Sequence, residues 1–255
     1  MAAIPVVASG DESTTIGARM THPTPDPDPE WVPGRVTPHK PGPPAVWLKM
    51  LERITNEVMV LARYRMTWRT VNDLVDDSAA IQEQPYFVEW ISELYATTMA
   101  LGVRKMADRS SDAASLFILL KQIAEHPDGL TREWYLSDIY EDWGKNFDHA
   151  FTRRADPKKL GHIDPDVVLA DQRRLVEAAD PLRLYVNHHI AHAQAEPKAT
   201  IPTFRDLHEA LDVLNELFLK YELLLTRGNR EPFEPVIPFP WQGIFDRAWS
   251  EKRET

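Results

Sequence analysis

Apolar residues recur every three or four positions along most of the chain, which is the spacing of amphipathic helices that bury one face. The longest such stretch covers about residues 44–77 and carries Trp47, Leu51, Ile54, Val58, Leu61, Trp68 and Val75. A second follows over about residues 85–108, and a third, which Ser111 or Asp112 would cap, ends near His126. No segment alternates apolar and polar residues convincingly, as a half-buried strand would. The pattern therefore predicts an all-α fold.

The clearest predicted helix lies in the C-terminal third of the chain. Thr203 is its N-cap and Gly228 supplies its C-terminal stop, because these residue types favour the two ends of a helix. Its apolar stripe has an unbroken spacing of three or four through Phe204, Leu207, Leu211, Leu214, Phe218, Tyr221 and Leu225. A stripe of this length indicates a helix that is buried within a helical bundle.

Aspartate–proline pairs mark further boundaries. Asp156–Pro157 and Asp164–Pro165 each have the form of an N-cap followed by proline at the first helical position. The helix that begins at Pro165 is expected to extend to about residue 179. Asp180–Pro181 should then interrupt it, because a proline ring clashes with the preceding helical turn.

Proline also divides the chain into three predicted regions. Ten of the 21 prolines fall within residues 1–44, and repeated X-Pro pairs disfavour helix and favour extended backbone. We therefore predict a proline-rich, extended or disordered N-terminal tail over residues 1–43 and a helical domain over residues 44–228. Residues 229–255 contain PFEPVIPFPWQGIF and are predicted to form a proline- and aromatic-rich strap with a short terminal helix.

Charge and composition narrow the classes of function. The chain has 29 basic and 39 acidic residues, a formal net charge of −10. A broad nucleic-acid-binding surface is excluded, because nonspecific binding depends on neutralising phosphates, but a local basic site is compatible with this balance. The absence of cysteine excludes disulfides, thiolate zinc sites and cysteine nucleophiles. No stretch approaches the roughly 18 consecutive apolar residues of a membrane span, and the N-terminus is a poor signal peptide, so we expect a cytoplasmic protein without membrane contact.

Candidate chemistry is concentrated in one histidine cluster. The chain has no phosphate-binding glycine loop, no G-x-S-x-G and no H-E-x-x-H. Residues 184–192, LYVNHHIAH, place three of the nine histidines within five positions. On a helix His188 and His192 would lie about 40° apart on one face. Histidine titrates near neutral pH, so the cluster could supply general acid–base groups, while Asn187 could hold a phosphate or orient an imidazole.

Three interpretations of the cluster remain open on residue types alone. The histidines can be partly buried or interface side chains that are satisfied by their neighbours. His188 and His192 can instead form half of a metal site, with His162, His208 or carboxylates as further ligands. The third interpretation is chemistry on nucleic acid.

The segment NHHIAHAQAEPKATIPTFRDLHEALDVLNELFLKY, which begins at Asn187, resembles the C-terminal signature of the HEPN superfamily, most closely its abortive-infection AbiU-like branch. In that signature R-N-x-x-x-A-H is followed by a short polar loop, P-T-F/Y-x-D-L and a leucine-rich helix. Asn187, Ala191 and His192 match the first part, and residues 202–207 match the second. The earlier sequence LGVRKMADR is similar to the end of the family's second helix, and the resemblance covers about residues 45–228.

The resemblance implies an HEPN-like helical bundle that acts as a homodimer. Active members cleave RNA without a metal, using the arginine and histidine of R-x4–6-H from two protomers in a shared cleft. By this resemblance His192 is the acid–base residue of an active enzyme. From the residue types, Asn187 would then position a phosphate or an imidazole, and His188 or His189 would serve as an auxiliary cation. No cofactor is expected. The implied partners are RNA and an antitoxin or other defence-system protein.

The chain departs from the family pattern at the arginine, because Val186 stands directly before Asn187. Arg183 is the nearest upstream arginine, but nine residues before His192 corresponds to about 180° around a continuous helix. It could share the face of His192 only with a break between them. Arg104, Arg109 and Arg183 are the candidate RNA-binding cations. Two hypotheses follow: a metal-independent endoribonuclease of the phage-defence or toxin–antitoxin type, or a non-catalytic dimeric module that binds RNA or a partner protein.

Overall fold

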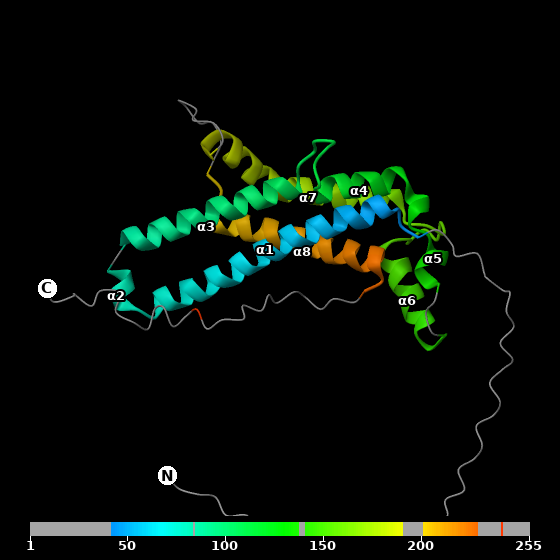
Figure 1. Ribbon diagram of the computed structural model, residues 1–255, viewed down its shortest axis with the longest axis horizontal. Helices are drawn as coiled ribbons and strands as arrows, with labels where there is room; N and C mark the ends of the chain where they lie inside the picture. Colours follow the sequence, from blue (N-terminus) through cyan, green and yellow to red (C-terminus); the bar gives the residue numbers. More distant parts are fainter. Residues whose placement is uncertain (1–41, 84, 138–140, 191–200, 229–240, 242–255) are drawn as a thin grey trace, which may run out of the picture. The chain divides into compact units, whose positions relative to one another are not determined.

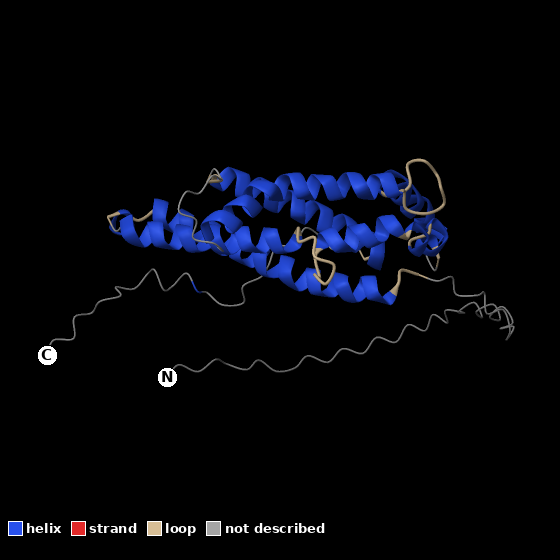
Figure 2. Cartoon of the chain, turned by 90° about the horizontal axis from the view of Figure 1, so that it is seen from above, coloured by secondary structure: helices blue, strands red, loops and turns tan. Residues whose placement is uncertain are grey.

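The computed structural model describes residues 42–83, 85–137, 141–190, 201–228 and 241 (Figures 1 and 2). These residues form helices, turns and loops, and among them the one β-type pairing is an isolated antiparallel bridge between Thr131 and His162. The all-α prediction is therefore confirmed. The predicted tail and most of the predicted C-terminal strap lie outside the described residues, so these region boundaries stay predictions.

Two long helices form an antiparallel hairpin. Helix α1 (Ala45–Asp76) leads through the short α2 (Ala79–Gln82) into α3 (Pro85–Met106), which returns along it (Figure 1). Helix α1 buries the predicted apolar positions Trp47, Leu51, Ile54, Val58, Leu61 and Val75. The two helices approach closely at Gly102, where an added Cβ would lie 2.3 Å from a terminal methyl of Leu61.

Helices α4 (Leu116–Glu125), α7 (Pro165–Tyr185) and α8 (Phe204–Thr226) complete the bundle. Helix α7 packs against α3, α4 and α8, so it is the central element of the core. Helix α8 buries the predicted stripe except Phe204, which is exposed. Each fully buried Leu or Phe stabilises the fold by roughly 1.5–3 kcal/mol relative to an exposed one. The remaining elements are the 3₁₀ turn Pro127–Gly129, α5 (Arg132–Leu136) and α6 (Glu141–Arg154).

The N-caps predicted from sequence are only partly confirmed by the hydrogen bonds at the helix starts. Thr203 forms the predicted N-cap of α8: its Oγ1 accepts a hydrogen bond from the Asp206 N–H at 3.2 Å, and its own N–H donates to Asp206 Oδ2 at 2.7 Å. This reciprocal pair is a capping box. The predicted cap of α4 was wrong, because Ser115 rather than Ser111 or Asp112 accepts from the Ile118 N–H.

The predicted helix at Asp156–Pro157 is also absent from the described structure. Asp156 is buried, and its carboxylate accepts hydrogen bonds from the backbone N–H groups of Leu160 at 2.6 Å and Gly161 at 3.0 Å. The aspartate thus organises a turn rather than a helix start. At the end of α8, Arg227 rather than Gly228 adopts the left-handed conformation, with φ of 57°.

Helix α7 does not stop at Pro181, which corrects the predicted end near residue 179. It continues to Tyr185 and passes into a π-helical turn, Val186–Ile190. Proline removes one backbone donor, but Leu182 and Val186 on either side of this last turn are buried in the core. Their burial accounts for the continuation of the helix. None of the helices in the described part of the chain is both long enough and apolar enough to cross a membrane.

Candidate functional site

A pocket lies where the C-terminal end of α3 and the following turn meet the end of α7 and the π turn. Its volume is about 280 Å³, and it is lined by Arg104, Ala107, Asp108, Arg109, Arg183 and Asn187. We call it the Arg–Asn pocket. It brings together Asn187 and all three arginines that sequence analysis named as RNA-binding candidates.

The central contact of the pocket joins residues 83 positions apart. Arg104 Nε donates a hydrogen bond to Asn187 Oδ1 at 3.0 Å. The contact uses the acceptor of the carboxamide, so its NH₂ group can donate to an anion in the pocket. It also uses one of the five N–H groups of the guanidinium, and within the described residues Arg104 makes no other side-chain hydrogen bond.

The other two arginines are held at the pocket by weaker contacts. Arg183 donates from Nε and Nη2 to Asp180 Oδ1, at 2.9 and 2.7 Å. Both partners of this ion pair are more than one third exposed, and such pairs contribute about 0–1 kcal/mol. The Arg109 guanidinium lies 5.8 Å from the centre of the Phe117 ring. Either guanidinium can therefore turn toward an anionic ligand at small cost.

Asp108 is the one carboxylate among the lining residues. The backbone N–H of Ser110, at 2.9 Å, and the Ser110 hydroxyl, at 2.8 Å, hold the pKa of Asp108 below its usual value, and the charge of Arg104 adds to this effect. Asp108 is therefore ionised at neutral pH and is not suited to act as an acid there. With Asp180 counted as the partner of Arg183, three guanidinium groups stand against two carboxylates, so the pocket keeps an excess positive charge on a chain of net charge −10.

The histidine cluster lies on an unusual piece of backbone. Val186–Ile190 form a π-helical turn, a feature that often occurs at functional sites. Val186, at the position that the resemblance assigns to arginine, is 0% exposed and belongs to the core. The π turn falls between Arg183 and His192 in the sequence. His192 itself lies outside the described residues.

His188 and His189 are half-buried within the π turn, and the rings of His189 and Tyr185 stack with centroids 5.3 Å apart. The two histidines considered as further metal ligands contact other groups. His162 Nδ1 is 2.8 Å from the carbonyl oxygen of Ile163, and His208 Nε2 is 3.2 Å from the Tyr95 hydroxyl. Among the described residues no three His, Asp or Glu side chains lie together as metal ligands. The proposed metal pair His188 and His192 includes His192, which lies outside the described residues, so the metal interpretation of that pair stays a prediction.

Sequence analysis did not single out a second cationic pair, Arg65 and Arg69, which lines a separate pocket between α1 and α8. The available signal was their i,i+4 spacing, which places both on one helix face. It was not recognised because nothing local to α1 indicates that α8 leaves a cavity beside it.

Comparison with known proteins supplies one match. The family model for AbiU2, a HEPN family, matches residues 47–244 of this chain. The matched range includes every residue of the Arg–Asn pocket, the π turn and His192. No curated protein and no solved structure is significantly similar to the chain.

Proposed function

The chain belongs to the AbiU2 family of HEPN proteins, a defence-associated family of the abortive-infection type, and on that premise we propose that it acts on RNA through the Arg–Asn pocket. The observation that carries the proposal is the contact between Arg104 and Asn187, with Arg109 and Arg183 beside it. The planar fork of arginine matches the oxygen atoms of a phosphate, and several arginines around one cavity favour a phosphodiester.

The size of the pocket is compatible with a single phosphate and part of its ribose. Its volume of about 280 Å³ lies just below the range of roughly 300–1,000 Å³ that is typical of sites enclosing a whole small ligand. A phosphate group with part of its ribose would occupy it, while the rest of the RNA lies outside. The same pocket provides a substitute for the missing motif arginine, because Arg104 reaches Asn187 from another helix.

We propose metal-independent cleavage as the activity. In this reaction His192 takes the proton of a 2′-hydroxyl, the 2′-oxygen attacks phosphorus, the bond from phosphorus to the 5′-oxygen breaks, and a protonated imidazole gives its proton to that leaving oxygen. The guanidinium groups stabilise the charge that develops on the phosphate. The second imidazole would be His192 of a second copy in a homodimer, with His188 or His189 as an auxiliary cation.

The experiment compares RNA binding and RNA degradation by the purified chain in excess chelator. For His192→Ala we expect cleavage to fall by about 10²–10⁴-fold, the usual contribution of general acid–base catalysis, with RNA affinity retained. For Arg104→Gln we expect weaker binding. The slope of log Kd against log salt concentration should also decrease by about 0.7 for each phosphate of single-stranded RNA that the variant no longer neutralises.

Arg63→Gln is the matched control, because Arg63 is an exposed arginine of α1 that does not line the pocket. It should keep the affinity and the salt slope of the unmodified chain. If Arg104→Gln binds RNA with an unchanged affinity and slope, the Arg–Asn pocket is not the RNA site and the proposal is refuted.

A second candidate function is a non-catalytic dimeric module that binds RNA or a partner protein with the same pocket. The burial of Val186 favours it, since this position cannot supply a cation to the cleft. This candidate predicts that the unmodified chain binds RNA, or captures an antitoxin or defence-system protein, without degrading RNA. His192→Ala would then have no effect on RNA integrity. Light scattering of the purified chain tests the homodimer that both candidates assume.

A further inference from the structure

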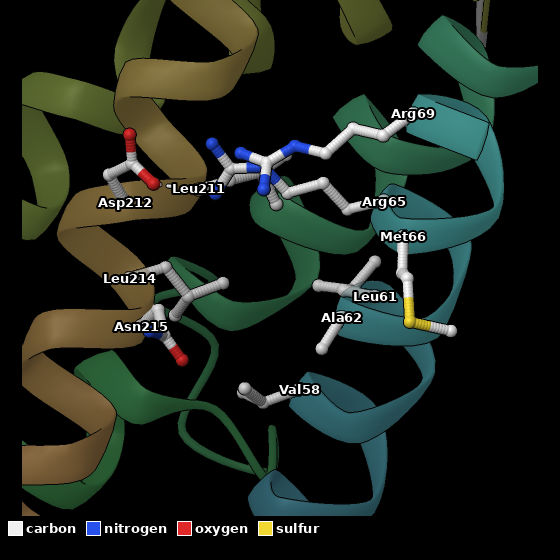
Figure 3. A pocket seen from close by; sticks show the side chains of 10 residues that line it. All are labelled: Val58, Leu61, Ala62, Arg65, Met66, Arg69, Leu211, Asp212, Leu214 and Asn215. Carbon is white, nitrogen blue, oxygen red and sulfur yellow. Dashed lines mark hydrogen bonds and ion pairs between the residues drawn. The ribbon is translucent and has the colours of Figure 1, made fainter. Parts of the chain in front are cut away.

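A second pocket lies between α1 and α8 and shares no lining residue with the Arg–Asn pocket. Its volume is about 480 Å³, and its lining includes Leu61, Arg65, Met66, Arg69, Leu214 and Asn215. Figure 3 shows Arg65 and Arg69 extending from α1 toward Asp212 on α8. Below them in this view lie four apolar side chains, those of Leu61, Ala62, Val58 and Leu214. The pocket therefore has a cationic end and a mainly apolar end that also carries Asn215.

Arg65 is a mostly buried cation in the wall of this pocket. Its side chain is 17% exposed, and its Nη1 donates to Asp212 Oδ1 at 2.5 Å. Its Nε is buried and has no hydrogen-bond partner among the described residues. The Nε–Nη2 edge of a guanidinium is one of the edges that pair bidentately with a carboxylate or phosphate. A buried donor without a partner destabilises the fold, and an anion would pair with Nε only after the Arg65 side chain turned toward the pocket.

Arg69 adds a second positive charge one helical turn away. The i,i+4 spacing places it on the same face of α1 as Arg65, and like charges at this spacing repel each other. Arg69 makes no ion pair with any residue that the structure describes. Asp212 is 66% exposed and offsets only one of the two charges. The pocket is therefore cationic within an acidic chain.

The charges of this pair also affect the neighbouring histidine. Burial lowers the pKa of His208, and the positive charges of Arg65 and Arg69 lower it further, against the opposing effect of Asp212. His208 is accordingly neutral at physiological pH and does not add to the repulsion.

We propose that the α1–α8 pocket binds a small amphipathic anion. A carboxylate or phosphate head pairs with Arg65 and Arg69, and a short apolar body lies on Leu61, Met66 and Leu214. The volume falls within the range of roughly 300–1,000 Å³ that is usual for small-molecule sites. Apolar floors with a few placed polar groups are likewise typical of such sites. The apolar residues supply affinity, and the two guanidinium groups select for negative charge.

The test uses octanoate and octyl phosphate as probes that combine a head with an apolar body. Acetate and inorganic phosphate represent the head alone, and octanol represents the body alone. Calorimetric titration gives Kd, and thermal unfolding gives the shift of Tm. At a hundredfold excess over Kd we expect a rise in Tm of roughly 5–10 °C for one of the two combined probes. The head-only and body-only probes should bind at least tenfold more weakly.

Arg69→Gln is the main variant, because Arg69 is exposed and its replacement should not disturb folding. It should raise the Kd of the combined probe at least tenfold, and Arg63→Gln, on another face of the same helix, should leave it unchanged. Arg65→Gln should have at least as large an effect as Arg69→Gln. Ala62→Leu narrows the apolar end without changing charge, and should weaken octanoate more than acetate.

Binding of neither combined probe overturns the proposal, and so does a Kd that Arg69→Gln does not change. Equal affinity for acetate and octanoate would also overturn it, because the apolar body would then contribute nothing. RNA binding by Arg69→Gln is measured in parallel and should equal that of the unmodified chain. A failure at the α1–α8 pocket is in this way distinguished from a failure at the Arg–Asn pocket.

Discussion

Replacement of Gly102 by alanine tests the packing of α3 on α1. The added Cβ would lie 2.3 Å from Leu61 Cδ2 and 3.1 Å from Leu61 Cδ1, so the Leu61 side chain must move. Overpacking of a core costs about 1–3 kcal/mol. Replacement of glycine by alanine within a helix stabilises the fold by about 0.8–1.0 kcal/mol through helix propensity. The difference predicts that Gly102→Ala lowers the free energy of unfolding by about 0–2 kcal/mol.

We expect a value near 1 kcal/mol, because Leu61 also borders the α1–α8 pocket and can shift partly into it. A sharper prediction is that the stability effect of Gly102→Ala changes sign when Leu61 is replaced by alanine. Leu61→Ala alone should cost about 2–5 kcal/mol, because it removes a buried side chain. In the Leu61→Ala background the clash is gone, so Gly102→Ala should stabilise by about 0.8–1.0 kcal/mol.

Urea unfolding of the four chains measures this coupling as a double-mutant cycle. Gly144→Ala is the matched control, since an added Cβ at that helical glycine meets nothing within 4 Å. The control should stabilise by about 0.8–1.0 kcal/mol in either background. A Gly102→Ala effect with the same sign and size with and without Leu61 would refute the close approach of the two helices.

Three further predictions concern helix ends and pH. Thr203→Ala removes the N-cap of α8 and should lower the free energy of unfolding, measured in urea, by about 0.5–2 kcal/mol. Thr203→Ser should keep most of the stability, and equal stabilities of the Ala and Ser variants would contradict this. The pKa of His208 is lowered in the fold, so the native state binds fewer protons than the unfolded chain as pH falls below about 6.5. Its stability contribution is therefore complete above that pH and declines below it, and His208→Gln should flatten this part of the stability–pH curve; an unchanged slope would contradict the assignment. Arg227→Gly removes the cost of a left-handed backbone conformation for a non-glycine residue, which is about 1–2 kcal/mol. It also removes a charged hydrogen bond to the Ser137 carbonyl, worth about 1.5–3 kcal/mol, and a cation–π contact with Trp134, worth about 0.5–1 kcal/mol. The net result should be destabilisation by about 1 kcal/mol in calorimetry, and a rise in Tm would refute the balance.

The candidate site illustrates how far sequence reasoning extends. Sequence analysis named Arg104, Arg109, Arg183 and Asn187 without a geometry that related them. No local signal indicates that the end of α3 meets the end of α7, because 83 residues separate Arg104 from Asn187. The pair Arg65 and Arg69 was missed for the same reason, since the cavity that gives it meaning depends on α8.

Two of the errors in the predicted elements have a common cause. Pro181 breaks a helix in isolation, yet α7 continues because Leu182 and Val186 on the last turn are buried by neighbouring helices. Arg227 takes the left-handed position expected for Gly228, because Trp134 and Ser137 hold its guanidinium. In each case contacts distant in sequence exceed a local preference of about 1–3 kcal/mol.

The amino-acid order alone established that this chain is helical, roughly where most of its helices lie, and which faces they bury. It could do so because periodic burial and side-chain capping act over a few neighbouring positions. Only the packed bundle decided which cations share a cavity, that Val186 is buried, and that the histidine cluster lies on a π turn. These features depend on side chains that meet across helices, where position follows from the packing of the whole core.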